Sequence, residues 1–108
     1  MTVRELADAV GMKAASLPDG DREIGGVYIG DLLSWVMGRA KGDDAWITIM
    51  SNQNIVAVAT LADTAVVILA EGVIPDDGVA ALAEQKGVNI LLSDLAAYET
   101  AMKIRDCL

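Results

Sequence analysis

The second half of the sequence alternates between short apolar runs and longer stretches in which apolar residues recur at helical spacing. Strands that alternate with helices are typical of a parallel sheet covered by helices on both faces. We therefore expect an α/β fold in three layers, with a largely parallel sheet. The patterns predict strands at 45–50, 65–70 and 88–92, and helices at 52–62, 77–86 and 94–106.

The first half of the sequence begins with a predicted helix followed by two short strands. Thr2 and Glu5 have the spacing of a capping box, and Gly11 is positioned to end the helix that they begin. Strands are predicted at 12–17 and 23–29, with a turn between them. We expect these two to form a short, hairpin-like pair at one edge of the sheet, on its N-terminal side.

A second helix is predicted to follow at 31–40. Asp31 is a good N-cap for it, because Asp side chains accept hydrogen bonds from the free amides of a first helical turn. No linker, repeat or change of composition divides the chain, so residues 1–108 are predicted to form a single domain.

The predicted helix at 52–62 has hardly any polar face, although a helix on the surface of a small domain normally keeps one. Its second face must be covered by a neighbouring element, such as the N-terminal helix, or by a second copy of the chain. We expect a homodimer formed through the helix Asn54–Ala62, with Trp35 nearby. The apolar residues of this helix are Ile55, Val56, Ala57, Val58, Ala59, Leu61 and Ala62.

Composition limits the possible partners and cofactors. The 108 residues include 16 acidic and 8 basic side chains, and this formal net charge of −8 opposes binding to nucleic acid or to an anionic membrane. The chain has no His and one Cys, Cys107, so neither a zinc site nor a Cys–His nucleophile is predicted. The sequence has no signal sequence and no long apolar run, so we expect a cytoplasmic protein. We also expect that the protein uses no cofactor.

A polar run follows the predicted strand at 45–50, at the end of the strand where open α/β sheets usually bind ligands. The free amides of a helix start, together with amide side chains, are suited to a phosphate or a carboxylate. The alternative is that Ser51 and Asp31 only cap helices. The predicted ligand-binding residues are Ser51, Asn52, Asn54, Glu71, Gly72 and Asp31.

Sequence motifs for phosphoryl transfer are absent, because the chain contains no P-loop and no dinucleotide fingerprint. The acidic pairs at 43–44 and 76–77 are predicted to be solvated residues of a turn and of a helix start. An enzyme remains an alternative, in which Asp31 and Glu71 hold a divalent metal and the substrate is a phosphorylated metabolite or a nucleotide.

From Gly25 to Gly72, the sequence GGVYIGDLLSWVMGRAKGDDAWITIMSNQNIVAVATLADTAVVILAEG resembles the DRTGG-domain family, and the similarity extends over residues 2–104. The run from Gly30 to Ser34 is also similar to the N-terminal domain of HPr kinase/phosphorylase. The resemblance implies an α/β fold with a largely parallel sheet. In larger proteins, DRTGG domains accompany phosphotransacetylase domains and CBS-containing pyrophosphatase domains, which implies a regulatory or dimerising module.

The chain departs from the residues that give this family its name. Asn52-Gln53-Asn54 stands where Asp-Arg would follow one strand, and Ala70-Glu71-Gly72 stands where Thr-Gly-Gly would follow the next. If the family's Asp-Arg pair binds a ligand, the resemblance implies that neutral amides replace it in this chain.

These observations together predict a non-catalytic regulatory or small-ligand-binding module that forms a homodimer. A nucleotide or a phosphorylated small molecule is the expected ligand class. The alternatives are the enzyme described above and an accessory subunit of a larger metabolic complex, whose acidic surface would bind a basic partner.

Overall fold

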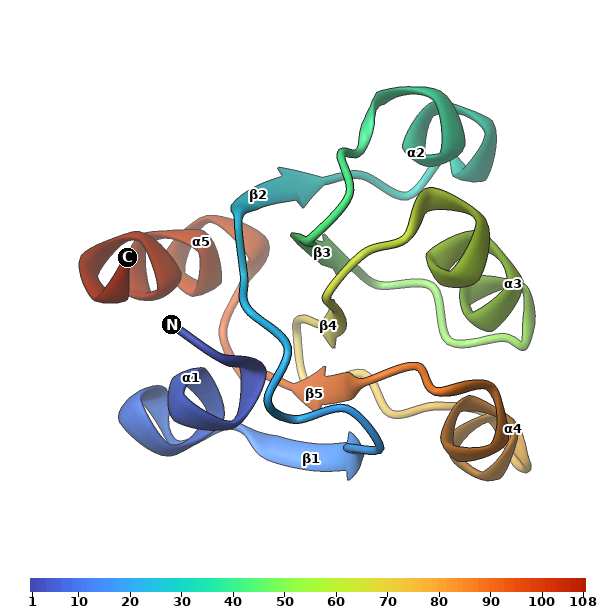
Figure 1. Cartoon of the computed structure of the whole chain (residues 1–108), viewed down its shortest axis with the longest axis horizontal. Coiled ribbons are helices and arrows are strands. Elements are labelled where there is room, and N and C mark those ends of the chain that lie inside the picture. The colour runs from blue at the N-terminus through green and yellow to red at the C-terminus, as the bar shows by residue number, and fades with distance from the viewer.

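The computed structural model describes all 108 residues and contains five helices and five strands (Figure 1). None of the helices is long and apolar enough to cross a membrane. In chain order the elements are α1 (Val3–Val10), β1 (Lys13–Ser16), β2 (Gly26–Ile29), α2 (Leu33–Arg39), β3 (Asp44–Thr48), α3 (Asn54–Ala62), β4 (Val66–Leu69), α4 (Val79–Lys86), β5 (Ile90–Leu92) and α5 (Ala97–Cys107).

The strands form one sheet in the order β1-β5-β4-β3-β2. β2, β3, β4 and β5 are parallel to their neighbours, and only β1 runs antiparallel, beside β5. Each parallel connection therefore passes through one helix, as expected for crossover connections. The α/β fold with a largely parallel sheet, predicted from the apolar runs, is confirmed.

The sheet separates two apolar clusters, one under each layer of helices. α1 and α5 cover one face, and α2, α3 and α4 cover the other (Figure 1). Successive strand residues point to opposite faces, so Ala45 and Ile47 of β3 join the cluster under α1 and α5, while Trp46 joins the other. β3 and β4 are buried throughout, which explains why their sequences are continuous apolar runs.

The two N-terminal strands do not pair with each other as predicted. β1 lies at one edge of the sheet, and β2 lies at the opposite edge beside β3. The segment between them crosses the amino ends of the strands, where the amide of Ile24 donates to the Met1 carbonyl (2.9 Å) and that of Gly25 to the Asp43 carbonyl (2.8 Å). Contacts of this kind hold residues 23–25 outside the strand, which therefore begins only at Gly26.

α3 owes its nearly continuous apolar surface to its position in the middle of a helical layer. Its two neighbours are α2 and α4, and Ile55, Val56, Val58 and Ala59 are buried in the cluster beneath all three helices. α1 lies on the other face of the sheet, so the alternative that the N-terminal helix covers α3 is wrong. One copy of the chain is enough to explain the composition of α3, apart from the exposed Ala57 and Leu61.

Candidate functional site

The carboxyl ends of the four parallel strands and the start of the antiparallel strand β1 lie at the same end of the sheet. Every predicted ligand-binding residue lies in or beside the loops at this carboxyl end of the strands. The geometry of these loops determines which of the residues face a cavity and which only hold the loops together.

Asp31 joins two loops and does not cap α2. Its Oδ1 accepts hydrogen bonds from the Thr48 hydroxyl (2.8 Å) and from the Ile49 amide (3.1 Å). α2 begins after Leu32 without any side-chain cap. The predicted capping role is therefore wrong, because two donors at the end of β3 compete successfully for the carboxylate.

Ser51 also contacts another loop. Its hydroxyl donates to Asp76 Oδ1 (2.8 Å), and the Asp76 amide donates to the Ser51 carbonyl (2.9 Å). α3 begins two residues later than predicted, after Gln53, and the Asn52 side chain satisfies one of its first amides by accepting from Asn54 (2.9 Å). The helix start thus depends on Asn52, and the predicted Ser51 cap is wrong.

Glu71 and Gly72 form a tight turn that brings two loops together. Both have left-handed backbone angles, with φ of 62° and 73°. That conformation costs a non-glycine residue roughly 1–2 kcal/mol, so Glu71 is held there by its surroundings. The Glu71 amide donates to the Leu95 carbonyl (2.8 Å) and the Gly72 amide to the Ser93 carbonyl (3.0 Å), which fixes the β4–α4 loop against the β5–α5 loop.

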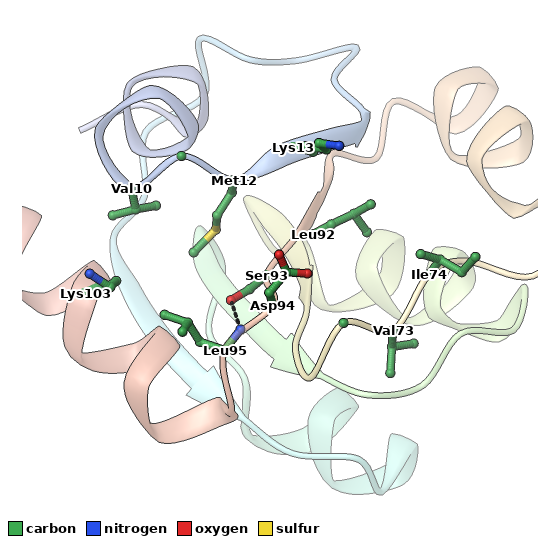
Figure 2. A pocket seen from close by; sticks show the side chains of 12 residues that line it. Val10, Met12, Lys13, Val73, Ile74, Leu92, Ser93, Asp94, Leu95 and Lys103 are labelled. Atoms are coloured by element: carbon green, nitrogen blue, oxygen red, sulfur yellow. Dashed lines mark hydrogen bonds between the residues drawn. The ribbon is translucent and has the colours of Figure 1, made fainter.

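A cavity of about 510 Å³ lies beside these two loops (Figure 2). Its walls come from the end of α1 and the start of β1, from the β4–α4 loop, from the end of β5 with the loop that follows, and from α5. We call it the lysine pocket, and it is lined by Val10, Gly11, Met12, Lys13, Gly72, Val73, Ile74, Leu92, Ser93, Asp94, Leu95 and Lys103.

Gly72 is the only predicted ligand-binding residue that lines this pocket. Asn54 lines a separate groove of about 500 Å³ between α3 and α4, together with Gln53, Leu61 and Lys86 among others. The remaining predicted residues, Ser51, Asn52, Glu71 and Asp31, line no cavity of the structure. The structure therefore divides the predicted site and does not bring its polar side chains together.

The charged groups of the lysine pocket lie on different walls. In Figure 2 Lys13 lies at the top of the pocket and Lys103 at its left side, with Met12 between them and with Ser93 and Asp94 near the centre. Neither lysine forms an ion pair within the chain. Ser93 is already engaged, because its hydroxyl lies 2.8 Å from that of Thr100 and accepts from the Leu95 amide (3.2 Å). The two ammonium groups are thus free to bind an anion.

The sequence interpretation missed this pocket for an identifiable reason. Lys13 reaches it only because β1 pairs with β5, whereas the prediction paired β1 with β2. The rule that directed attention to Glu71 and Gly72, namely that ligands bind after parallel strands, applies equally to Ser93 and Asp94 after β5. No short-range pattern marks Lys103, which comes from the middle of α5.

No group of three or more acidic, His or Cys side chains is placed to hold a metal ion. Asp31 is bound to Thr48 and Ile49, while the turn of Glu71 is bound to the β5–α5 loop. The arrangement therefore gives no support to the alternative in which Asp31 and Glu71 share a divalent metal.

Comparison with known protein families assigns the chain. The model of the DRTGG domain matches residues 5–107. The chain belongs to the DRTGG-domain family. In this DRTGG domain the runs Asn52-Gln53-Asn54 and Ala70-Glu71-Gly72 both lie at the carboxyl ends of the strands, as described above.

A solved structure confirms the fold. The chain is similar to the crystal structure of the CBS and DRTGG domains of the regulatory region of Clostridium perfringens pyrophosphatase, complexed with the activator diadenosine tetraphosphate. The TM-score is 0.72 at 12% sequence identity, over 95% of this chain and 45% of that chain. This DRTGG domain thus spans less than half of that neighbour. No match was found among curated proteins.

Proposed function

We propose that this DRTGG domain is a non-catalytic regulatory module that binds a phosphorylated small molecule of the nucleotide class in the lysine pocket. The observation that carries the proposal is the pair Lys13 and Lys103. Two of the 8 basic side chains of a chain with net charge −8 line one cavity, and neither has an acidic partner within the chain.

A phosphate group bound to one of these lysines would supply the negative partner that the lysine lacks within the chain. Charge-assisted hydrogen bonds from ammonium groups to phosphate are short and roughly twice as strong as neutral ones. The cavity of about 510 Å³ is within the usual size range of small-molecule sites. Ligand pockets typically combine apolar walls with a few polar groups, and this pocket has the same character.

The other walls suit the uncharged parts of a nucleotide. Met12, Val73 and Leu95 offer an apolar surface against which a base can pack, and the Asp94 carboxylate can accept a hydrogen bond from a sugar hydroxyl. The neighbouring pyrophosphatase structure is that of a regulatory region in complex with a nucleotide activator. The likeness to that region supports both the regulatory role and the ligand class proposed here.

Binding without bond cleavage agrees with the groups that line the pocket. Ser93 is its only hydroxyl, and hydrogen bonds with Thr100 and Leu95 occupy it. A serine nucleophile needs an adjacent general base, and the Ser93 hydroxyl makes no hydrogen bond to a lysine or an acidic side chain of the pocket. The proposal is therefore that the ligand changes the stability or the assembly of the domain.

Thermal unfolding in the presence of ligands tests the proposal. The panel is inorganic phosphate, AMP, ADP, ATP and diadenosine tetraphosphate, each with and without Mg²⁺. A ligand at one hundred times its Kd adds about 2.7 kcal/mol, which raises the Tm of a domain of this size by several degrees. We expect the increase to disappear in Lys13→Met and Lys103→Met, while the Tm without ligand changes little.

Lys86→Met is the matched control, because Lys86 lines the groove between α3 and α4 together with Asn54. Loss of the ligand effect in Lys86→Met and Asn54→Ala, but not in the pocket variants, would move the site to that groove. A Tm that no member of the panel changes would refute the nucleotide proposal.

We also propose that this DRTGG domain forms a homodimer in the cytoplasm. The apolar composition of Asn54–Ala62 no longer requires a second copy, because α2 and α4 cover the sides of that helix. A dimer now has to be explained by other exposed apolar residues, and several of these lie near α2.

A further inference from the structure

Asp94 is the only acidic side chain that lines the lysine pocket. It is exposed, and it forms no ion pair with Lys13, with Lys103 or with any other basic group of the chain. Both oxygens of its carboxylate are therefore free to accept hydrogen bonds. An acceptor without a partner, in a pocket whose other charges are positive, indicates a ligand that carries hydrogen-bond donors as well as an anion.

The backbone on both sides of Asp94 is fixed to the β4–α4 loop. The Ser93 carbonyl accepts from the Gly72 amide (3.0 Å), and the Leu95 carbonyl accepts from the Glu71 amide (2.8 Å). A Cβ atom added at Gly72 would lie 3.9 Å from Asp94 Oδ1, so the carboxylate lies beside the Gly72 backbone. The carboxylate therefore occupies a defined place in the pocket before any ligand binds, which reduces the cost of ordering it.

The pocket has two halves, on opposite faces of the sheet. The apolar side chains are Val10 and Met12 on the α1–α5 side, and Val73 and Leu92 on the other side. Lys103 of α5 belongs to the first half. Lys13 belongs to the second, because it is paired with Leu92 and the side chains of paired residues share a face. Each half thus holds one ammonium group and apolar side chains, while Asp94 lies near the centre of the pocket (Figure 2).

We propose that Asp94 makes the lysine pocket selective for ribonucleotides, because its carboxylate accepts hydrogen bonds from the 2′ and 3′ hydroxyls of the ribose. This inference deepens the proposed function and rests on the binding of a nucleotide in this pocket. In a nucleotide the sugar joins the base to the phosphate. Whichever half of the pocket holds the phosphate, the sugar in the middle of the ligand would face Asp94, and the base would pack against the apolar side chains of the other half.

Charge repulsion keeps a phosphate away from the place beside Asp94. Two negative groups about 4 Å apart repel each other more strongly near a protein surface than in water. The phosphate therefore has to lie next to a lysine, and only a donor without negative charge gains from contact with Asp94. Two neighbouring hydroxyls match the two oxygens of one carboxylate, whereas inorganic phosphate has no uncharged part to fill this place.

Titration calorimetry of the full chain tests the proposal with matched ligands, namely AMP and dAMP, ADP and dADP, and ATP and dATP. Hydrogen bonds to charged groups are among the stronger ones, so we expect each 2′-deoxy form to bind about tenfold more weakly than its ribose counterpart. The comparison uses the unmutated protein and does not depend on the folding of a variant. Equal affinity of the two forms would overturn the inference.

Asp94→Asn should reduce the preference for the ribose form to less than about twofold, because the hydroxyls lose a charged acceptor. It should also strengthen the binding of inorganic phosphate, since the repelling charge is gone. Asp77→Asn is the matched control, because Asp77 lines a separate hollow before α4, forms no ion pair, and loses the same charge. A preference that persists in Asp94→Asn would contradict the assignment of the sugar to Asp94.

Two other ligand groups suit a carboxylate, and the same titrations distinguish them from a sugar. A preference that requires Mg²⁺ and is lost in EDTA would place a metal ion on Asp94. The edge of guanine also presents two donors side by side. If dGMP binds as tightly as GMP, and both bind more weakly to Asp94→Asn, the base and not the sugar contacts Asp94. Either result overturns the inference.

The outcomes separate the inference from the function on which it rests. Ribose and deoxyribose forms that bind equally well, and that both require Lys13 and Lys103, would overturn the inference and keep the lysine pocket as a nucleotide site. The absence of binding to every nucleotide tested would overturn both.

Discussion

The two ends of the parallel strands differ in how their polar groups are used. At the amino end, Arg22, Asn89 and Ser16 each make two or more hydrogen bonds to groups distant in the sequence. At the carboxyl end, Lys13 and Lys103 line an open cavity without an ion-pair partner. The amino end holds the fold together, and the carboxyl end leaves charge available to a ligand.

This difference has a physical basis in the connections. The residues before β2, β4 and β5 belong to chain segments that cross the amino end, and their carbonyls and amides need partners when they are buried. Side chains such as Asn89 supply those partners. The loops at the carboxyl end bond mainly to one another, as Ser51 does with Asp76, and therefore leave space between them.

Asn89→Ala should have the largest effect on stability. The Asn89 side chain is 2% exposed, donates to the carbonyls of Asp19 (2.8 Å) and Ala65 (2.9 Å), and accepts from the Asp19 amide (3.0 Å). Its removal leaves the buried Ala65 carbonyl and two partly buried backbone groups of Asp19 without this partner, and we expect a loss of about 2–4 kcal/mol in the free energy of unfolding by urea. Asn54→Ala, at the carboxyl end, removes an exposed side chain without a hydrogen bond and should change stability by less than about 0.5 kcal/mol.

An equal loss in the two Asn variants would contradict the comparison, because stability would then not be concentrated at the amino end. The m-value of each unfolding curve should stay constant, which shows that the variants change stability and not the extent of unfolding.

Arg22→Met should have the next largest effect. Arg22 contacts Asp43 Oδ1 (2.8 Å), Asp63 Oδ1 (2.9 Å) and the Asp63 carbonyl (2.7 Å), and so joins the segment before β2 to those before β3 and β4. Both aspartates have left-handed backbone angles, with φ of 70° and 57°. Burial acts to lower the pKa of Arg22, but the hydrogen bonds to Asp43 and Asp63 outweigh it, and the net pKa is raised.

Because this cluster is partly exposed, we expect Arg22→Met to cost only about 1–2 kcal/mol in urea unfolding. Arg105→Met is the matched control, since Arg105 forms no ion pair on α5 and should be close to neutral. The wild-type protein should lose part of the same free energy of unfolding at high salt, because salt screens the ion pairs of Arg22. Salt-independent stability would indicate that the backbone contact to Asp63 contributes most of the effect.

The regular half of the fold could be predicted from sequence because its signals are local. The runs around β3, β4 and β5 are apolar on both faces, and no other element of this length fits them. The position of β1 could not be predicted, because its partner β5 lies more than seventy residues away and nothing in residues 13–16 distinguishes one edge of a sheet from the other.

The candidate site was harder to predict than the fold, since its polar side chains have several possible partners. Asp31 and Ser51 both have the residue type and position of helix caps, yet the Thr48 hydroxyl and the Asp76 carboxylate bind them. An Asp or Ser side chain before a helix often caps it, but here tertiary hydrogen bonds replace the cap. The lysine pocket assembles from four separate parts of the chain, so only the three-dimensional arrangement reveals it.

The smallest expected effect also belongs to the amino end, where α1 begins, and concerns how stability depends on pH. The Thr2 amide donates to Glu5 Oε1 (2.9 Å), and this hydrogen bond, together with the Thr2 side-chain contact, lowers the pKa of Glu5 from its ordinary value of 4.5. A carboxyl group with a lowered pKa in the folded state stabilises the protein above its unfolded pKa. That contribution is lost as pH falls through the folded pKa, so the stability of the wild-type protein should decrease below about pH 4.5 partly for this reason.

Glu5→Gln isolates this contribution, because glutamine keeps the shape of the side chain and cannot titrate. We expect Glu5→Gln to lower the Tm at pH 7 by less than Arg22→Met does, and the difference from wild type to shrink toward pH 3. Glu71→Gln is the matched control at the carboxyl end, because the Glu71 side chain makes no hydrogen bond or ion pair and the substitution removes the same charge. If Glu71→Gln shows the same pH dependence as Glu5→Gln, general charge repulsion in this acidic chain explains both, since each substitution removes one negative charge. Convergence in Glu5→Gln alone would assign the acid sensitivity to a single hydrogen-bonded carboxylate at the end of the sheet where polar groups stabilise the fold.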